Sequence, residues 1–169
     1  TSQEIYPHLG ASSVLTPNVQ WRFQSGAKVT FAHMFYEKEK YNWQGSQIPL
    51  LMFDELVHFT ESQFFYMFSR NRSTCGVRPY IRATCNPDGE SWVARFIDWW
   101  IDPETGYADE SRCGKLRYFI RRNNIIHWAD TPQQLYEEFH LYSPEEMEEV
   151  KSVSFISAKL TDNAAMMKH

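Results

Sequence analysis

The sequence has 169 residues, 43% of them hydrophobic, which is enough to bury the core of a single domain. No apolar stretch approaches the roughly 18 residues of a membrane-spanning helix, and no signal peptide is visible, so we expect no membrane partner. The formal net charge of −4 excludes a surface that is basic throughout, although a protein that binds nucleic acid needs only local basic patches.

The cysteines and histidines carry no metal signature. Cys75, Cys85 and Cys113 are spaced neither as a metal site nor as a redox motif, so we expect free thiols, as in a reducing compartment. None of the six histidines falls in an H-E-x-x-H pattern, and zinc chemistry therefore has no support.

The first predicted element is a β-hairpin. Residues 19–23 and 29–31 alternate between apolar and polar side chains, and residues 24–26 between them end in a glycine that favours a turn. Residues 36–47 are polar and charged and predict an exposed connection.

An apolar run at residues 50–53 ends abruptly in two adjacent carboxylates, Asp54 and Glu55. A continuous apolar run of this length predicts a strand that is covered on both faces. In ATPases and GTPases with this arrangement, the first carboxylate holds Mg²⁺ and its neighbour positions the attacking water. The alternative is a strand that happens to stop at polar residues.

A helix and a second strand follow. Thr60 and Gln63 have the spacing of a capping box, and the next residues repeat phenylalanine on one helical face. Residues 80–84 then form a short strand-like run, followed by a turn signal at residues 85–89. A strand–helix–strand crossover makes parallel neighbours, so both strands are expected to end at the same edge of a sheet.

Four polar side chains are therefore predicted to meet at that edge: Asp54, Glu55, Thr84 and Asn86. Open α/β sheets bind ligands at this edge, and the four groups suit a magnesium-nucleotide site. The alternative for Thr84 and Asn86 is turn chemistry alone, because Asn-Pro-Asp-Gly is a strong turn signal by itself.

The later elements predict supporting architecture. A helix near residues 90–101 repeats large aromatic residues at four-residue steps, which favours a core face over a platform for nucleic acid bases. A polar loop at 102–114 and a strand at 116–120 follow. Hydroxyl, proline and Gln/Glu patterns predict two capped helices that begin after Thr131 and Ser143, and residues 153–156 favour a last strand.

Basic side chains cluster in two places. Arg70 and Arg72 follow the crossover helix, where a helix C-terminus favours cations in any case. They are candidates for an arginine finger given in trans by a neighbouring subunit, or for a DNA contact. Arg117, Arg121 and Arg122 are better interpreted as a solvated face.

Taken together, these motifs resemble the large terminase subunit of tailed bacteriophages, the motor that packages DNA into proheads. Residues 50–55 resemble its Walker B strand and residues 83–89 its coupling motif, while residues 68–73 and 155–163 also resemble family segments. The resemblance covers residues 20–163 and implies an α/β fold, a partial P-loop NTPase with a mostly parallel sheet flanked by helices and an added hairpin. We expect one domain over residues 1–169.

By position, the resemblance implies that Asp54 serves Mg²⁺, directly or through water, and that Glu55 is the catalytic carboxylate. Thr84 and Asn86 would sense the γ-phosphate of ATP and move residues 87–100, which would shift a DNA-gripping surface. The implied partners are double-stranded DNA, the portal protein, the small terminase subunit and further copies in a ring, all in the host cytoplasm.

One departure from the family matters most, because no Walker A loop is present. The seven glycines never frame G-x-x-x-x-G-K-[ST], so the chain has no nest of backbone N–H groups for the phosphates. We expect a fragment of a longer polypeptide that binds ATP poorly and hydrolyses it negligibly by itself. Residues 157–169 would then begin a linker toward a nuclease domain.

Two other functions fit the same residues. One is a metal-dependent nuclease in which Asp54, Glu55 and Asp88 hold two ions. The other is a non-enzymatic α/β scaffold or ring-interface module whose acids are incidental.

Overall fold

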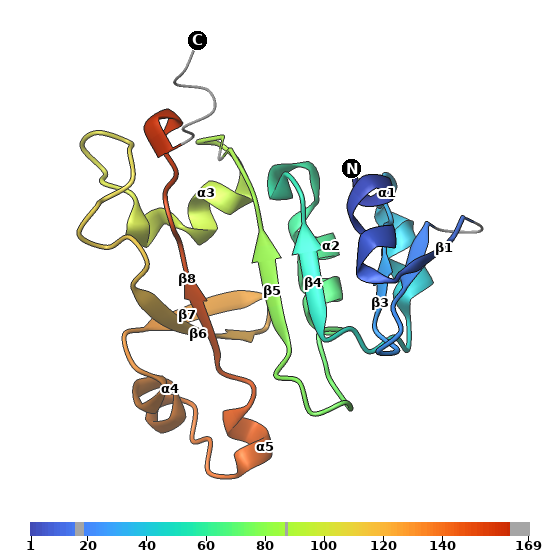
Figure 1. The fold of residues 1–169 in the computed structure, drawn as a ribbon. Coiled ribbons are helices and arrows are strands. Elements are labelled where there is room, and N and C mark those ends of the chain that lie inside the picture. Colours follow the sequence, from blue (N-terminus) through green and yellow to red (C-terminus); the bar gives the residue numbers. More distant parts are fainter. Residues whose placement is uncertain (16–18, 87, 163–169) are drawn as a thin grey trace. The chain divides into compact units, whose positions relative to one another are not determined.

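The computed structural model describes residues 1–15, 19–86 and 88–162. Contacts divide the chain into two compact units, Thr1–Asp88 and Gly89–His169, and each is described by itself (Figure 1). Whether the chain is one functional domain stays a prediction, and most of the predicted linker lies outside the described residues.

The first unit opens with two short helices, α1 (Ser2–Ile5) and the 3₁₀ helix η1 (Pro7–Leu9), and a three-stranded antiparallel sheet. Its strands β1 (Ser12–Val14), β2 (Gln20–Arg22) and β3 (Lys28–Thr30) follow in chain order. The predicted hairpin is confirmed as β2 and β3.

The rest of this unit is a parallel strand pair with its crossover. In chain order it comprises η2 (Glu37–Trp43), β4 (Leu50–Phe53), η3 (Leu56–His58), α2 (Glu61–Phe68) and β5 (Tyr80–Ala83). β4 and β5 pair in parallel, with Leu50 opposite Tyr80 and Phe53 opposite Ala83. The parallel neighbours predicted from the sequence are confirmed, and Figure 1 shows their arrowheads pointing the same way.

The capping box of α2 is also confirmed. The Thr60 hydroxyl accepts a hydrogen bond from the Gln63 N–H at 3.0 Å, and the Gln63 side chain accepts one from the Thr60 N–H at 2.9 Å. This reciprocal pair satisfies two N–H groups that a helix start otherwise leaves without partners.

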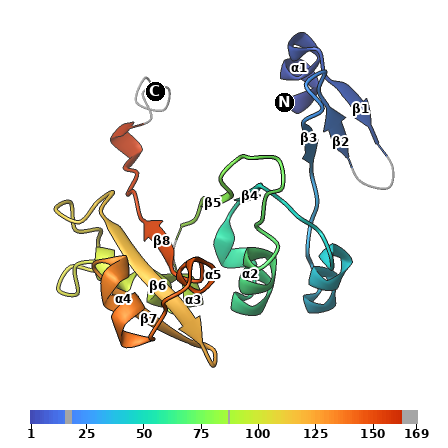
Figure 2. The ribbon, with the colours of Figure 1, turned by 90° about the horizontal axis from the view of Figure 1, so that it is seen from below.

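β4 is covered on one face rather than two. Phe53 is buried and its ring lies 5.4 Å from that of Phe64 on α2, and Figure 2 shows α2 on one side of the strand pair. Leu50 and Met52 alternate with the buried residues and are 40% and 72% exposed. The prediction of a doubly covered strand was wrong for the described chain, because α2 is the helix that packs on the pair and it covers one side.

The segment predicted to be an exposed connection contains the 3₁₀ helix η2, and its Lys40 is 7% exposed. The Lys40 ammonium group contacts Glu37 Oε1 and donates to Ser62 Oγ at 2.5 Å. Glu37 Oε2 in turn accepts from the Thr60 hydroxyl at 2.6 Å. A buried lysine must be paired, so this network ties η2 to the start of α2.

The Glu37 network predicts a loss of stability in acid. Hydrogen bonds from Lys40, then Thr60 and Ser62, lower the pKa of Glu37 from 4.5 to about 2. A carboxyl whose pKa is lower in the folded state contributes stability above its unfolded pKa, and that contribution is lost as pH falls through the folded value.

We therefore expect Glu37→Gln to lower the free energy of unfolding at pH 7 by about 1–2 kcal/mol, a figure reduced for the solvent screening of a half-exposed side chain. The deficit should shrink as the pH falls from about 4.5 toward 2. Urea denaturation of both proteins at pH 7 and pH 3 measures it, and an unchanged deficit would contradict the assignment.

The second unit is built around another antiparallel sheet. Its elements are α3 (Trp92–Phe96), η4 (Asp98–Trp100), β6 (Leu116–Arg122), β7 (Ile125–Ala129), α4 (Pro132–Glu138), α5 (Pro144–Met147), β8 (Lys151–Ser154) and η5 (Leu160–Asp162). β6 lies between β7 and β8 and is antiparallel to both. The two capped helices are confirmed, and the last strand is present but lies at Lys151–Ser154 rather than at residues 153–156, whereas β7 was not predicted.

The core of this unit lies on both faces of β6. On one face Phe119 packs against Phe96 and Trp128, with ring centroids 5.6 and 5.2 Å apart. Trp100 is 1% exposed and its indole N–H donates to the Lys115 carbonyl at 3.0 Å. The predicted core role of the aromatic stripe is confirmed. On the other face a cluster forms from Ile120, Ala129, Leu135 and Leu141.

The fold is therefore mixed α/β, but the prediction of a mostly parallel sheet was wrong. The described residues form three small sheets, and only the β4–β5 pair is parallel. The cause is connection length. A two-residue turn at Asn123 and Asn124, both with positive φ, can join only antiparallel neighbours.

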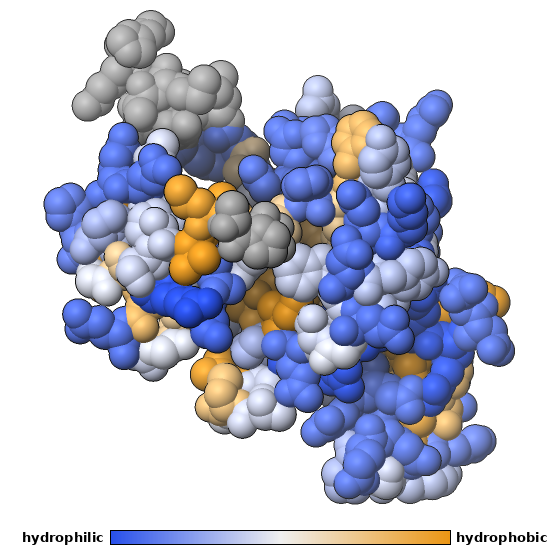
Figure 3. Space-filling view, turned by 90° about the vertical axis from the view of Figure 1, so that its right-hand side faces the viewer, coloured by the Kyte–Doolittle hydropathy of each residue, from blue (hydrophilic) through white to orange (hydrophobic). Residues whose placement is uncertain are grey.

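The face shown in Figure 3 is largely hydrophilic, with its apolar residues in separate groups. Among the described residues, no helix is both long and apolar enough to cross a bilayer.

Candidate functional site

Asp54 and Thr84 leave the parallel pair at the same edge, because each directly follows the last residue of its strand. Backbone pairing continues beyond the strands. The Thr84 N–H donates to the Phe53 carbonyl at 3.0 Å, and the Leu56 N–H donates to the Thr84 carbonyl at 2.8 Å. The backbone thus holds the two polar turns together.

The Thr84 hydroxyl connects both carboxylate residues. It donates to Asp54 Oδ1 at 2.9 Å and accepts from the Glu55 backbone N–H at 3.1 Å. One hydroxyl has one hydrogen to donate and lone pairs with which to accept, so both contacts form at once. The turn after β5 is therefore hydrogen-bonded to the turn after β4.

Glu55 has an uncommon backbone conformation, with φ of 52° and ψ of 66°. This left-handed region costs a non-glycine residue about 1 kcal/mol or more. The contacts of its N–H with Thr84 and of its carbonyl with the His58 N–H, at 2.9 Å, hold it there. Both the Asp54 and Glu55 side chains are exposed, so a ligand can reach them.

His58 was missed by the sequence reasoning. Its Nδ1 lies 3.1 Å from Glu55 Oε2, and both side chains are exposed. The signal that could have identified it is the spacing of three residues between Glu55 and His58, which one helical turn brings together.

Asn86 is not joined to the other predicted site residues by a described contact. It is exposed and lies two residues beyond Thr84. Pro87, the next residue of the predicted coupling motif, lies outside the described residues. The structure thus connects Asp54, Glu55 and Thr84, and a role for Asn86 stays a prediction.

The residues of the nuclease alternative do not assemble. Among the described residues, which include Asp54, Glu55 and Asp88, no three His, Cys, Asp or Glu side chains gather closely enough to hold a metal ion. A two-metal site needs such a cluster of ligands. The arrangement therefore favours chemistry that needs one or two carboxylates.

Arg70 and Arg72 lie at the opposite edge of the strand pair from the carboxylates. The Ile48 N–H, before β4, donates to the Arg70 carbonyl at 3.0 Å. Asn71 fixes this turn by donating to the carbonyls of Ile48, Pro49 and Tyr80, at 2.9, 3.1 and 3.2 Å. The Arg70 guanidinium lies 4.9 Å from the Tyr66 ring centroid, and Arg72 is exposed. Neither arginine is placed beside the carboxylates of its own chain.

The second group of arginines is largely structural. The Arg117 side chain is only 13% exposed; it lies 3.0 Å from Asp130 Oδ1, and its guanidinium lies 4.8 Å from the Trp99 ring centroid. Arg122 pairs with Glu149 at 2.6 Å. The interpretation as a solvated face was therefore wrong for Arg117, because two aromatic rings and a carboxylate enclose it.

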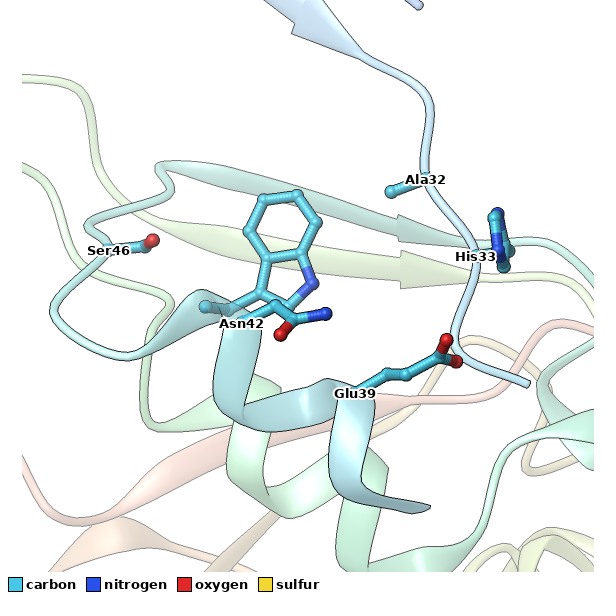
Figure 4. A pocket seen from close by; sticks show the side chains of 6 residues that line it. Ala32, His33, Glu39, Asn42 and Ser46 are labelled. Carbon is cyan, nitrogen blue, oxygen red and sulfur yellow. The ribbon is translucent and has the colours of Figure 1, made fainter. Parts of the chain in front are cut away.

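A pocket of about 340 Å³ lies elsewhere in the first unit. Figure 4 shows its lining, which comes from the segment after β3 and from η2 and the residues that follow it: Ala32, His33, Glu39, Asn42, Trp43 and Ser46. Glu39 already accepts from the Tyr36 N–H at 2.8 Å as a helix cap. None of the predicted site residues lines this pocket.

Asp54 suits a magnesium ion. Mg²⁺ takes oxygen ligands and usually keeps several waters, binding through one or two carboxylates together with substrate phosphates. An exposed carboxylate that is oriented by one hydroxyl meets this requirement.

The three free cysteines are consistent with the thiols that were expected.

Comparison with known families identifies the chain. Residues 5–165 match the family model described as the terminase large subunit, T4likevirus-type, N-terminal. Searches among curated proteins and among solved structures found no match. The match spans nearly the whole sequence. The chain therefore belongs to the family of N-terminal regions of T4-like large terminase subunits, and these subunits are part of the phage motor that packages DNA in the host cell.

Proposed function

We propose that Asp54, Glu55 and Thr84 form part of the ATP-hydrolysing site of the full-length large terminase subunit, and that hydrolysis drives double-stranded DNA into proheads. The observation that carries this proposal is the Thr84 hydroxyl, which contacts Asp54 Oδ1 and the Glu55 N–H at once. A nucleotide site at the carboxyl edge of parallel strands is the expected location in an α/β protein. Intact members of this family are ATPases.

Glu55 is the proposed base. Its exposed carboxylate orients a water, whose oxygen forms a bond to the γ-phosphorus while the bond to the ADP oxygen breaks. The proton of the water passes to Glu55, and ADP and phosphate leave. Asp54 would hold Mg²⁺, which when bound neutralises charge on the phosphates.

The phosphates themselves need a second binding element. The sequence contains no G-x-x-x-x-G-K-[ST], and the proposal therefore assigns the backbone nest and its lysine to another part of the full-length protein. ATP hydrolysis is therefore expected of the full-length protein, and activity is measured there.

Coupling to DNA is proposed to start at Thr84 and Asn86. When the γ-phosphate leaves, the groups that Asp54 and Glu55 contact change. The Thr84 hydroxyl is hydrogen-bonded to both residues and would transmit the resulting movement to the turn after β5. The chain passes from the first unit to the second at Asp88 and Gly89, directly after this turn. A shift there would pull on the residues that follow.

The proposed partners are those of a packaging motor: double-stranded DNA, the portal protein, the small terminase subunit and further copies in a ring, in the host cytoplasm. Arg70 and Arg72 lie at the far edge from the carboxylates of their own chain. A finger role would therefore operate in trans, on the nucleotide of a neighbouring subunit, and contact with DNA phosphates is the other role they suit.

Glu55→Gln in the full-length protein tests the proposal. Because glutamine keeps the size of the side chain but cannot accept the proton, we expect kcat for ATP hydrolysis to fall about 100-fold or more. Binding of ATP, followed with a fluorescent analogue, should stay within about 2-fold of the unchanged protein.

Glu61→Gln is the matched control. Glu61 lies in the first turn of α2, close to Glu55 along the chain, and its neutralisation should leave turnover within about 2-fold. If Glu55→Gln turned over ATP at the unmodified rate, the assignment of the site would be wrong.

A further inference from the structure

Glu55 is held at three points, and His58 supplies two of them. The His58 backbone N–H donates to the Glu55 carbonyl at 2.9 Å, and His58 Nδ1 lies 3.1 Å from Glu55 Oε2. The third point is the Glu55 N–H on the Thr84 hydroxyl. The 3₁₀ turn η3 and the left-handed Glu55 backbone together bring the histidine ring back over the carboxylate that precedes it.

The contact between His58 and Glu55 concerns the hydrogen on Nδ1 of the His58 ring. An ionised carboxylate only accepts hydrogen bonds, so the approach of 3.1 Å between Nδ1 and Oε2 is attractive when Nδ1 carries a hydrogen. Neutral imidazole in this tautomer and protonated imidazolium both donate through Nδ1.

We propose that His58 is a positioning residue for the Glu55 carboxylate, an inference that rests on the proposed ATPase function. Nδ1 lies 3.1 Å from Oε2, and a ring that stays there leaves Oε1 to accept from the attacking water. A free glutamate side chain samples several rotamers, and a general base works only when it points at the proton it accepts. Both side chains are exposed, with 70% and 57% of their surface accessible, so the pair should contribute little to the stability of the fold. Removal of the pair should therefore appear in kcat rather than in the melting temperature.

Three variants of the full-length protein separate this role from simple packing. His58→Ala removes the donor, and we expect kcat for ATP hydrolysis to fall about 10-fold with KM for ATP unchanged. His58→Asn places an amide N–H near the position of Nδ1 and should recover most of the loss. His58→Gln places its amide nearer to the position of Nε2 and should recover much less. Melting curves should be the same for all three.

A double variant tests whether His58 acts through Glu55. If it does, adding His58→Ala to Glu55→Gln should cause no further loss of kcat, because the base that it orients is already inactive. The proposal is overturned if His58→Ala keeps kcat within about 2-fold, if Asn recovers no more than Gln, or if the two losses multiply. These outcomes differ from a failure of the ATPase proposal, in which Glu55→Gln alone leaves turnover unchanged.

Discussion

Thr84→Val is expected to lower kcat for ATP hydrolysis in the full-length protein by about 30- to 100-fold, and to lower DNA packaging with it. Valine has nearly the shape of threonine but neither donates to Asp54 Oδ1 nor accepts from the Glu55 N–H, the two contacts that now measure 2.9 and 3.1 Å. Each lost hydrogen bond costs about 1–1.5 kcal/mol, and about 1.4 kcal/mol corresponds to a factor of 10 in rate.

Thr84→Ser is the matched control, because serine keeps the hydroxyl and loses only a methyl group. It should retain kcat within about 3-fold. ATP turnover and packaging of DNA into proheads are measured for both variants. Serine as damaging as valine would mean that the methyl group matters rather than the bridge, and an active valine variant would remove Thr84 from the site.

Leu135→Ala should produce a large loss of stability in the second unit. Leu135 is fully buried on α4, at 0% exposure, against Ile120, Ala129 and Leu141. Its truncation removes apolar contacts and leaves a cavity, for which losses of about 2–5 kcal/mol in the free energy of unfolding are typical.

Leu116→Ala provides the comparison for that loss. Leu116 lies on β6 in the same unit but is 53% exposed, so the same chemical change should cost less than about 1 kcal/mol. Urea denaturation followed by tryptophan fluorescence measures both. Equal losses at the two positions would show that the described core is misplaced.

Local signals in the sequence predicted local structure well. The hydroxyl of Thr60 and the amide of Gln63 form the expected capping box, because a helix start is decided by residues three positions apart. The parallel pairing of β4 and β5 followed from the single helix between them and from the geometry of crossovers.

Features that depend on partners distant in sequence were not predictable. β7 follows β6 after two asparagines with positive φ. Because this turn is so short, the sequence pattern did not separate a second strand from the first. Lys40 looked exposed in a charged segment, yet Ser62, 22 positions further along the chain, helps to bury it. Arg117 looked solvated, but its neighbours Trp99 and Asp130 become visible only in the folded chain.

The same division holds for the candidate site. Two strand ends at one edge placed Asp54 and Thr84 together, as expected from their positions. The left-handed backbone of Glu55 and the return of His58 onto its carboxylate are details of a single turn, and apolar patterning carries no information about them. Arg70 and Arg72 were predicted by their charge to be a finger given in trans or a DNA contact; the fold places them at the other edge of their own strand pair, and both roles stay predictions.

The most direct test is a structure of the full-length protein with Mg²⁺ and a non-hydrolysable ATP analogue. We expect the metal beside Asp54 and the γ-phosphate about 4–6 Å from the Glu55 carboxylate, a gap that one water can bridge, with Thr84 still in contact with the turn after β4. An analogue bound away from the carboxyl ends of β4 and β5, with Asp54 and Glu55 remote from its phosphates, would contradict the proposed site.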